Sequence, residues 1–390
     1  MNLTNLTILG STGSIGSQAL DIIREGEERF DVRALSAHSS WKKLADQINE
    51  FSPRYAVLVD DRHKVELEDR IKDDRCEVLY GQHHLESLAE DADTDCVLNS
   101  LVGFSGFIPT VKALQAGHRV ALANKESLVV GGALITKLLD ENEQAELIPV
   151  DSEHSAMLQC LVGESRESIE KIVITASGGP FWEWSREQMQ KITVEEALDH
   201  PNWSMGAKIT VDSATMMNKG LEIIETYWLF GLPLSKIEAV VHPQSIIHSI
   251  VTFTDGSSKA QLGPPNMKVP IQYALTYPKR SYLQADRLDW AVSQQMTFEP
   301  VDYERFPCLG LAREALQREE HAPAVLNAAN EVAVYRFLNE EIGYVDIPDV
   351  VESSLDKIAC KDNMSVESLR SIDEETRAFA RELRPKSVHS

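Results

Sequence analysis

A glycine-rich turn near the start of the chain constrains the fold more than any other feature. Gly10-Ser11-Thr12-Gly13-Ser14-Ile15-Gly16 follows the apolar run Leu6-Thr7-Ile8-Leu9 and opens a segment with helical periodicity. Glycines in this position permit a tight turn and let backbone N–H groups approach a pyrophosphate at the N-terminus of the next helix. The spacing is G-x-x-G-x-x-G rather than the more usual G-x-G-x-x-G, so the turn alone is a weak signal. Its place between a strand and a helix favours a dinucleotide-binding domain.

Short apolar strands and helical patterns alternate through residues 1–150. This alternation predicts an α/β domain with a doubly wound, Rossmann-like parallel sheet. The expected strands are 6–9, 32–35, 55–59, 96–99 and 119–123, and the first two expected helices are 15–24 and 41–51.

The rest of the chain has a different pattern. Residues 151–278 contain the strand-like runs 171–175 and 246–253 between loops rich in glycine and proline, which predicts an α+β catalytic domain. The connection 279–308, which follows Pro278 and contains Pro300 and Pro307, predicts a linker. Residues 309–390 have helical periodicity and predict a C-terminal helical bundle, with helices expected at 309–318, 322–339 and 365–383.

Composition excludes several classes of protein. A hydrophobic fraction of 43% with 25% charged residues is typical of a soluble globular protein, and we expect neither a membrane span nor a secretory signal. The five cysteines form no C-x-x-C pair, which favours reduced thiols in a cytoplasm over a disulfide framework or a zinc site. The net charge of −23 argues against nucleic acid as a partner. An anionic substrate then needs a local basic site, for which Lys125 and Lys219 are candidates.

The end of the second strand distinguishes the two nicotinamide cofactors. NAD-binding domains carry an Asp or Glu there that hydrogen-bonds the ribose. This chain has His38-Ser39-Ser40 instead, with Lys42 and Lys43 close behind, so NADPH is the expected cofactor. The two lysines are equally consistent with the exposed face of a helix. Asn124-Lys125-Glu126-Ser127 ends a later strand, where a doubly wound sheet borders its ligand crevice.

Three carboxylates suggest a metal site. Asp151 and Glu153 are two residues apart, so on an extended segment both side chains point the same way. Glu222 follows Lys219 and Gly220, which we read as a turn. Oxygen ligands of this kind suit a hard divalent cation, Mg²⁺ or Mn²⁺, with Co²⁺ as a third candidate. A pair of surface acids alone is common without a metal.

A second group of side chains suits a phosphate. Ser177-Gly178-Gly179 follows a strand, and its backbone is a candidate anion-binding nest. Ser213, Asn218 and Lys219 add hydroxyl, amide and ammonium donors. We call Ser177, Ser213, Asn218 and Lys219 the phosphate cradle.

The segment His200–Gly206 has the composition of a loop that closes over a ligand. Trp203 lies there between polar and small residues, which is an unusual place for a core tryptophan, although packing on the core is an equally open reading. His248, in a strand-like run, is equally consistent with a structural and with a substrate-facing role.

Taken together, these motifs resemble the 1-deoxy-D-xylulose 5-phosphate reductoisomerase family over essentially the whole chain. The resemblance implies NADPH- and metal-dependent conversion of 1-deoxy-D-xylulose 5-phosphate, a small phosphorylated sugar, to 2-C-methyl-D-erythritol 4-phosphate in non-mevalonate isoprenoid biosynthesis. It also implies a homodimer. The segments that carry it are 10–16, 123–127, 149–154, 177–181, 200–206, 211–222, 242–248 and 326–331.

The resemblance assigns candidate roles residue by residue. It implies that Asp151, Glu153 and Glu222 bind the metal and that Glu153, Lys125 and His200 act in catalysis. With the residues singled out above, the candidate substrate contacts are Lys125, Ser152, Glu153, Ser177, His200, Trp203, Ser213, Asn218, Lys219, Glu222 and His248. The candidate cofactor contacts are Gly10, Thr12, Gly13, Ser14, Ile15, Gly16, His38, Ser39, Ser40, Asn124, Glu126 and Gly206.

The sequence departs from the family pattern in two segments. His38-Ser39-Ser40 stands where members often carry Gly-Lys-Asn, which removes the lysine from the segment expected to bind the 2′-phosphate. Leu262–Met267 differs from the more common Gly-Glu-Pro-Asp form.

Two alternatives remain from the residues alone. A semialdehyde dehydrogenase needs a nucleophilic cysteine paired with a histidine, and neither Cys160 nor Cys308 has such a setting. A non-enzymatic NADP-binding regulator has no use for three carboxylates beside a phosphate cradle.

Overall fold

The computed structural model describes residues 3–26, 30–72, 75–201, 203, 205–292, 295–318, 321–359 and 364–385. Its contacts divide the chain into two compact units. The first unit comprises Met1–Ser127, Ile135–Ser155 and Asn266–Asp286, and the second comprises Leu128–Leu134, Ala156–Pro265 and Arg287–Ser390. Each compact unit is assembled from three segments of the chain, so the units do not correspond one to one to the predicted domains. The division into 1–150, 151–278, 279–308 and 309–390 therefore stays a prediction.

The first unit is built on a seven-stranded parallel sheet with the order β4-β3-β2-β1-β5-β6-β7. β1 is central, and the order reverses between β1 and β5, where open α/β sheets bind ligands at their carboxyl ends. Central strands are buried on both faces, which is why they are apolar runs rather than alternating ones. The doubly wound prediction is therefore confirmed. The strands are Thr4–Leu9 (β1), Phe30–Ala37 (β2), Tyr55–Leu58 (β3), Glu77–Tyr80 (β4), Cys96–Asn99 (β5), Arg119–Leu122 (β6) and Glu146–Pro149 (β7).

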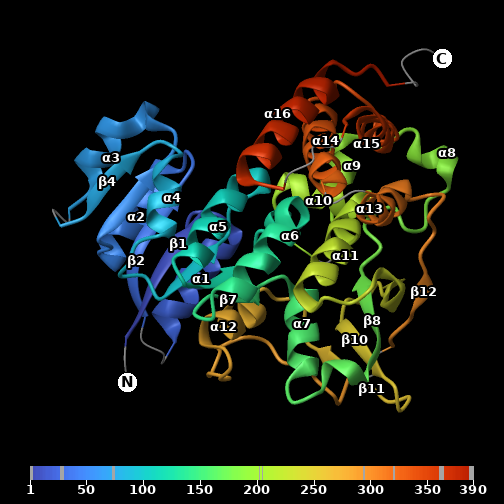
Figure 1. The fold of residues 1–390 in the computed structure, drawn as a ribbon, viewed down its shortest axis with the longest axis horizontal. Coiled ribbons are helices and arrows are strands. Elements are labelled where there is room, and N and C mark those ends of the chain that lie inside the picture. The colour runs from blue at the N-terminus through green and yellow to red at the C-terminus, as the bar shows by residue number, and fades with distance from the viewer. Residues whose placement is uncertain are drawn as a thin grey trace. The chain divides into compact units, whose positions relative to one another are not determined.

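Helices cover this sheet, with α2, α4 and α5 packed against its strands (Figure 1). Between the fourth and fifth strands of the second sheet in chain order, the chain returns to add α12, which packs on α1 and near β6 and β7. The helices are Ser14–Glu25 (α1), Trp41–Phe51 (α2), Lys64–Arg70 (α3), His84–Ala89 (α4), Phe107–Gln115 (α5), Glu126–Glu141 (α6), Ser152–Leu161 (α7) and Lys268–Thr276 (α12). α6 and α7 each contain residues of both units.

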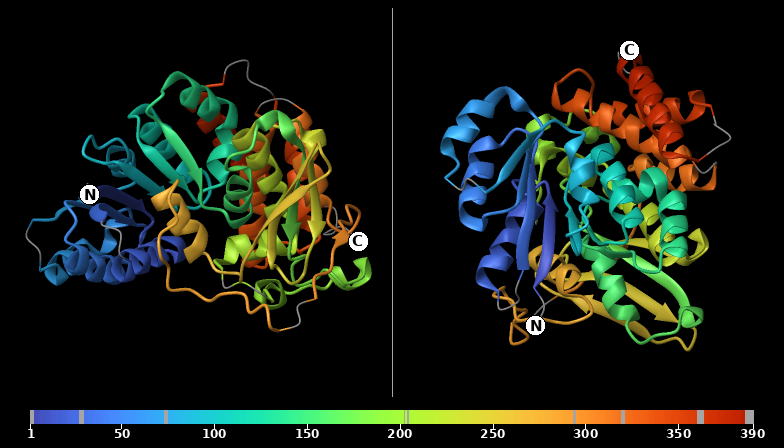
Figure 2. Two further views of the ribbon diagram at one scale, coloured as in Figure 1. Left: turned by 90° about the horizontal axis from the view of Figure 1, so that it is seen from below. Right: turned by 60° about the vertical axis from the view of Figure 1, so that its left-hand side comes forward.

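The second unit has a five-stranded mixed sheet with the order β11-β10-β8-β9-β12. β8 and β9 are parallel and the other pairs are antiparallel, so this part is α+β, as predicted. Figure 2 shows its longer strands side by side in green to yellow. The strands are Ile169–Ala176 (β8), Ile237–Val241 (β9), Ile247–Phe253 (β10), Ser258–Leu262 (β11) and Glu299–Pro300 (β12).

The helices of the second unit fall into two groups. Four lie between β8 and β9 in sequence: Arg186–Met189 (α8), Val194–Leu198 (α9), Ala207–Ala214 (α10) and Met217–Phe230 (α11). Four more form the predicted C-terminal helical region: Pro307–Gln317 (α13), Ala322–Leu338 (α14), Asp346–Lys357 (α15) and Val366–Glu382 (α16). Within the described residues, no helix is both long and apolar enough to cross a membrane.

Candidate active site

The glycine turn joins β1 to α1 in a conformation that few other residues adopt. Gly10 has φ +82°, and a Cβ on Gly16 would lie 2.5 Å from the carbonyl oxygen of Gly10. Gly13 is the N-cap of α1 and provides no side-chain cap, and the first turn of α1 contains no acidic residue. The first N–H groups of a helix lack intrahelical partners and attract anions. The turn is therefore suited to a phosphate group, as the sequence indicates.

Side chains from the next strand and helix hold this turn in place. The Gly10 N–H donates to Ser36 Oγ at 2.9 Å, and Ser11 Oγ donates to Gln47 Oε1 at 2.7 Å. Lys43 Nζ donates to Thr12 O at 3.0 Å and to Ser17 Oγ at 2.6 Å. Lys43 therefore places a positive charge beside the turn, whereas Lys42 lies over the ring of Trp41.

His38, Ser39 and Ser40 are exposed at the end of β2, and no acidic residue is among them. The position at which NAD-binding domains carry a ribose-binding acid is thus occupied by an imidazole and two hydroxyls. This arrangement is compatible with a 2′-phosphate.

Asn124 is fully buried after β6 and is used inside the protein. Its Nδ2 donates to the carbonyl oxygens of Leu101 and Gly103, each at 3.0 Å, and to Glu126 Oε2 at 3.0 Å. A Cβ on Gly106 would lie 2.3 Å from Asn124 Oδ1, so this glycine permits the close approach. The side chain of Asn124 therefore fixes the loop after β5. The assignment of Asn124 and Glu126 as cofactor contacts stays a prediction.

Asp151 and Glu153 do not lie on an extended segment, and that expectation is wrong. β7 ends at Pro149 and α7 begins at Ser152, so Glu153 lies in the first helical turn. Asp151 forms an ion pair with Lys125, whose side chain is 7% exposed against 10% for Asp151. Ser152 Oγ donates to Glu153 Oε2 at 2.5 Å. Acidic groups at a helix N-terminus are favoured by the helix dipole, which explains their position better than an extended strand does.

The loop after β8 approaches the end of α10 very closely. Gly178 has φ +89° and Gly179 has φ +70°. A Cβ on Gly179 would lie 2.8 Å from the carbonyl oxygen of Ser213, so only glycine fits there without displacement. The approach brings Ser177 and Ser213 to the same imidazole, because His200 Nε2 lies 3.1 Å from each hydroxyl oxygen.

The hydrogen bonds of His200 identify its neutral tautomer. The backbone N–H of Trp203 donates to His200 Nδ1 at 3.1 Å, so Nδ1 carries no proton. Nε2 then bears the proton and donates to one of the two serine hydroxyls. Burial lowers the pKa of His200 below its ordinary value of 6.5, which favours this neutral form.

Glu222 lies within helix α11 rather than at a turn, so that expectation is also wrong. α10 and α11 are joined at Met216, which has φ +60°. This sharp connection places Asn218, Lys219 and Glu222 on the first turns of α11. Asn218 Nδ2 donates to Glu222 Oε1 at 2.5 Å, and Lys219 forms an ion pair with the same carboxylate. The side chain of Glu222 is 1% exposed, so its charge depends on these two donors.

Trp203 is half-buried, and its ring centroid lies 6.5 Å from that of His248 on β10. Desolvation lowers the pKa of His248 to about 4, so this imidazole is neutral near pH 7. Its Nε2 lies near Gly263, which belongs to the segment Leu262–Met267 that departs from the family pattern. Gly206 is the N-cap of α10. Asn202 and Ser204 of the predicted closing loop lie outside the described residues, and closure of the loop stays a prediction.

Three sequence models of one family match this chain. The model of 1-deoxy-D-xylulose 5-phosphate reductoisomerase matches residues 6–132, that of its C-terminal domain matches 147–230, and that of the DXP reductoisomerase C-terminal domain matches 262–379. A 1-deoxy-D-xylulose 5-phosphate reductoisomerase from Chloroherpeton thalassium is 50% identical over 377 residues, which cover 97% of each chain. The chain belongs to the 1-deoxy-D-xylulose 5-phosphate reductoisomerase family. Another member, from Bacteroides fragilis, is 46% identical over 378 residues and again 97% of each chain.

Solved structures of the reductoisomerase family have the same fold. The enzyme from Zymomonas mobilis in complex with NADPH is 43% identical, with a TM-score of 0.90 over 97% of this chain and 98% of its own. A DOX-P reductoisomerase in complex with NADPH, fosmidomycin and magnesium is 40% identical, with a TM-score of 0.92 over 97% of both chains. The resemblance inferred from the motifs is thus confirmed.

The structure also argues against the semialdehyde dehydrogenase alternative, which needs a reactive cysteine. Cys160 and Cys308 are buried, and burial raises the pKa of Cys308 to about 12, so it does not supply a thiolate near neutral pH.

The supports of the glycine turn were not found by sequence reasoning. Ser36 and Gln47 reach the turn because β1 pairs with β2 and α2 follows. No local spacing signals such contacts, since the partners are 26 and 36 residues apart.

Proposed function

We infer that this protein converts 1-deoxy-D-xylulose 5-phosphate to 2-C-methyl-D-erythritol 4-phosphate, using NADPH and a divalent cation, in isoprenoid precursor biosynthesis. One observation carries this conclusion: a 1-deoxy-D-xylulose 5-phosphate reductoisomerase is 50% identical over 97% of the chain. The donors and carboxylates described above are chemically suited to the same reaction.

We propose that Asp151, Glu153 and Glu222 bind the cation. The fit rests on the donor set, since all three offer carboxylate oxygens, which Mg²⁺ and Mn²⁺ prefer, and Co²⁺ also accepts such ligands. Each carboxylate already has a hydrogen-bond or ion-pair partner that orients it: Lys125 for Asp151, Ser152 for Glu153, and Asn218 with Lys219 for Glu222. When bound, the cation supplies positive charge that stabilises oxygen anions developing on the substrate.

The phosphate cradle is proposed to hold the far end of the substrate. Ser177 and Ser213 present hydroxyls, and His200, neutral and donating from Nε2, orients one of them. Lys219 contributes an ammonium and Asn218 an amide. A phosphate held away from the reacting carbons fixes their position, and its binding energy lowers the barrier only if the rest of the substrate is aligned.

We propose that Glu153 moves the hydroxyl proton of the substrate, with Lys125 as a cationic neighbour. Glu153 accepts a hydrogen bond from Ser152 Oγ, which holds the carboxylate in one orientation. Trp203 and His248 are proposed to line the substrate region, with the segment 200–206 closing over it and excluding water.

Features of the glycine turn support the proposal that NADPH binds to the first unit. Residues 10–16 present uncapped helix N–H groups, Gly16 leaves room for the backbone, and Lys43 adds positive charge. The cofactor, when bound, supplies the hydride that reduces the rearranged aldehyde. We further propose that the protein is a cytoplasmic homodimer: the family resemblance implies the homodimer, and five scattered cysteines without a C-x-x-C pair favour a cytoplasm.

The activity is tested by following NADPH absorbance with 1-deoxy-D-xylulose 5-phosphate in the presence and absence of Mg²⁺. We expect oxidation of NADPH only when substrate and cation are both present, with 2-C-methyl-D-erythritol 4-phosphate as the product. Oxidation that persists after chelation would refute the metal's part alone. No oxidation in any mixture of the three would refute the proposed function.

We expect NADPH to bind at least about tenfold more tightly than NADH, because charge-assisted hydrogen bonds contribute roughly 1.5–3 kcal/mol each. Lys43→Ala should weaken the binding of both cofactors to a similar degree, since Lys43 lies at the turn that suits the pyrophosphate that they share. Lys42→Ala is the matched control, because Lys42 stacks on Trp41. Titration of both cofactors by fluorescence measures the effect, and equal affinities in the wild-type protein would contradict the cofactor assignment.

A further inference from the structure

The last turn of α10 is held on both sides of Ser213 by residues of the C-terminal helical region. Asn330 Nδ2, on α14, donates to Asp212 Oδ1 at 2.8 Å. The hydroxyl of Tyr344, between α14 and α15, donates to the carbonyl oxygen of Ala214 at 2.7 Å. Asn330 is fully buried and Tyr344 is 6% exposed. Two water-excluded hydrogen bonds therefore fix the residues immediately before and after Ser213.

Both carboxylate oxygens of Asp212 have a partner, which restricts the movement of this side chain and of its hydrogen bond with Asn330. Its second oxygen forms an ion pair with Lys208 Nζ at 2.8 Å, one helical turn earlier, and the two side chains are 1% and 6% exposed. A buried charge tolerates little displacement, because each partner lost leaves an uncompensated group in a medium of low dielectric. Lys208, within α10, thus holds the carboxylate of Asp212 in one orientation, and Asn330 ties that carboxylate to α14.

The second contact satisfies a helix terminus. α10 ends at Ala214, where carbonyl groups have no partner within the helix, and the chain then passes through Met216 in the left-handed region. A non-glycine residue held there costs on the order of 1 kcal/mol or more and persists only if its surroundings impose it. Burial raises the pKa of Tyr344 well above its ordinary value, so the phenol keeps its proton and remains a donor.

Tyr344 also packs against the loop that carries Ser177. Its ring meets the ring of Phe181 edge to face, with centroids 5.5 Å apart. Phe181 lies four residues after Ser177 in the loop that follows β8. One side chain thus supports both the segment that carries Ser177 and the segment that carries Ser213.

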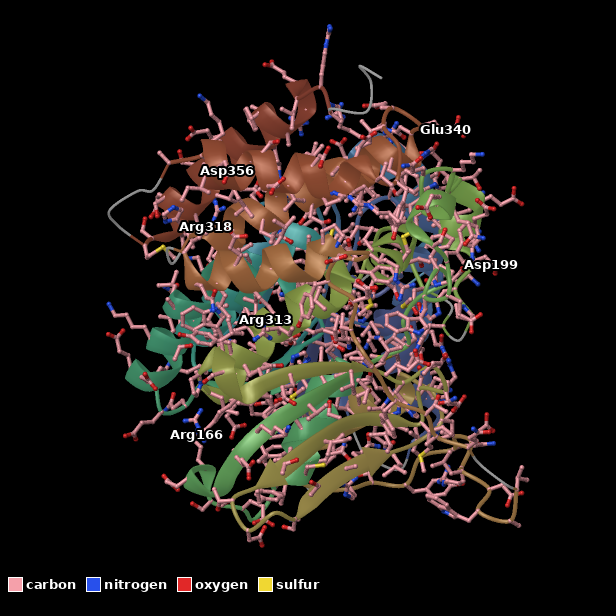
Figure 3. All side chains as sticks on the ribbon, turned by 90° about the vertical axis from the view of Figure 1, so that its right-hand side faces the viewer. Arg166, Asp199, Arg313, Arg318, Glu340 and Asp356 are labelled. Carbon is pink, nitrogen blue, oxygen red and sulfur yellow. The ribbon has the colours of Figure 1, made fainter. Side chains whose placement is uncertain are left out.

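The helices that provide these contacts are themselves anchored. Arg377 on α16 binds Glu331 on α14 at 2.7 Å, next to Asn330. Arg313 on α13, labelled in Figure 3, donates to the carbonyl oxygen of Ile237 at the start of β9 at 3.0 Å. Arg318 and Asp356, also labelled there, pair at 2.9 Å between α13 and the end of α15. The support behind Ser213 is therefore a connected framework.

We propose that Tyr344 and Asn330 are positioning residues that set the hydroxyls of Ser213 and Ser177 for the substrate phosphate. The inference rests on the proposed function, because it assigns a purpose to the phosphate cradle. Neither side chain touches the substrate. Both act through the backbone and helix that carry Ser213.

The test is Tyr344→Phe, which removes a single hydroxyl and keeps the ring against Phe181. We expect KM for 1-deoxy-D-xylulose 5-phosphate to rise about tenfold, the effect of weakening one charge-assisted hydrogen bond, with the Kd of NADPH unchanged. Tyr335→Phe is the matched control, since Tyr335 is 51% exposed on α14. Asn330→Ser provides a second, independent variant with the same expected pattern if Tyr344→Phe does not fold.

A double-variant cycle separates positioning from general destabilisation. In a Ser213→Ala background, Tyr344→Phe should raise KM less than twofold, because the group that it positions is already gone. A full tenfold rise in KM in that background would overturn the positioning role alone. The same holds if the KM values of Tyr344→Phe and Asn330→Ser both equal that of Tyr335→Phe. Absence of turnover in the wild-type protein would instead overturn the proposed function and this inference with it.

Discussion

Glu222→Gln is expected to lower kcat about 10³-fold while NADPH still binds, because a metal ion supplies several kcal/mol of charge stabilisation to the transition state. The carboxylate is 1% exposed and is oriented by Asn218 and Lys219. The amide keeps the shape of the side chain but removes one of three negative charges from the proposed ligand set. Turnover measured over a range of Mg²⁺ concentrations should show that activity is not restored by excess cation.

The control for this variant is Glu238→Gln. Glu238 lies on β9, where its carboxylate is 49% exposed and pairs with Lys171 at 2.9 Å. Exposed ion pairs contribute little, so kcat should change less than about twofold. NADPH titration by fluorescence checks that the cofactor site is intact in both variants. Wild-type kcat in Glu222→Gln at low Mg²⁺ would rule out a role in metal binding.

The fold of the first unit could be predicted because its signals are local. The run 6–9, the glycine turn and the helix that follows are consecutive in sequence, and the structure places them as β1 and α1. Alternation of apolar strands with helical patterns then implies a parallel sheet, since parallel strands require crossover connections. Short strands such as β4, with a partly exposed pattern, carry too weak a signal to be found this way.

Helix α11 could not be recognised from its sequence pattern. Its buried residues include Lys219, Glu222 and Glu225 as well as apolar neighbours, so polar side chains face inward and the usual amphipathic period is absent. Gly220 suggested a turn, but a Cβ there would lie 2.5 Å from the Cβ of Ala312, so the glycine instead allows α11 and α13 to pack closely. Polar side chains on the buried face thus obscured the secondary structure.

The sequence singles out the residues of the phosphate cradle as donors, and their role stays a prediction, but their arrangement required the structure. His200 lies 23 residues from Ser177 and 13 from Ser213, and it meets both because the loop after β8 approaches the end of α10 closely. The tautomer of His200 depends on the backbone of Trp203, which no side-chain pattern reveals. Such contacts are set by tertiary packing.

His200→Gln is expected to lower kcat/KM about 10²-fold, since loss of a single well-placed donor at an active site has an effect of this size. Glutamine retains a donor and an acceptor but does not reach both serine hydroxyls and the Trp203 N–H as the imidazole does. The same variant tests the pH dependence. Burial lowers the pKa of His200, so its neutral form persists down to a pH below 6.5 and is lost as the pH falls through the shifted value.

Protonation of His200 removes the lone pair on Nδ1 that accepts the Trp203 N–H, so kcat/KM of the wild-type protein should fall at acid pH. His200→Gln should show a lower and flatter profile, because the amide does not titrate. Ionisation of the substrate phosphate, near pH 6, is common to both proteins and cancels in their ratio. His63→Gln is the control, since His63 is 48% exposed in the first unit, and it should follow the wild-type profile. If the ratio of the His200→Gln and wild-type profiles is constant with pH, the neutral imidazole is not what positions the two serines.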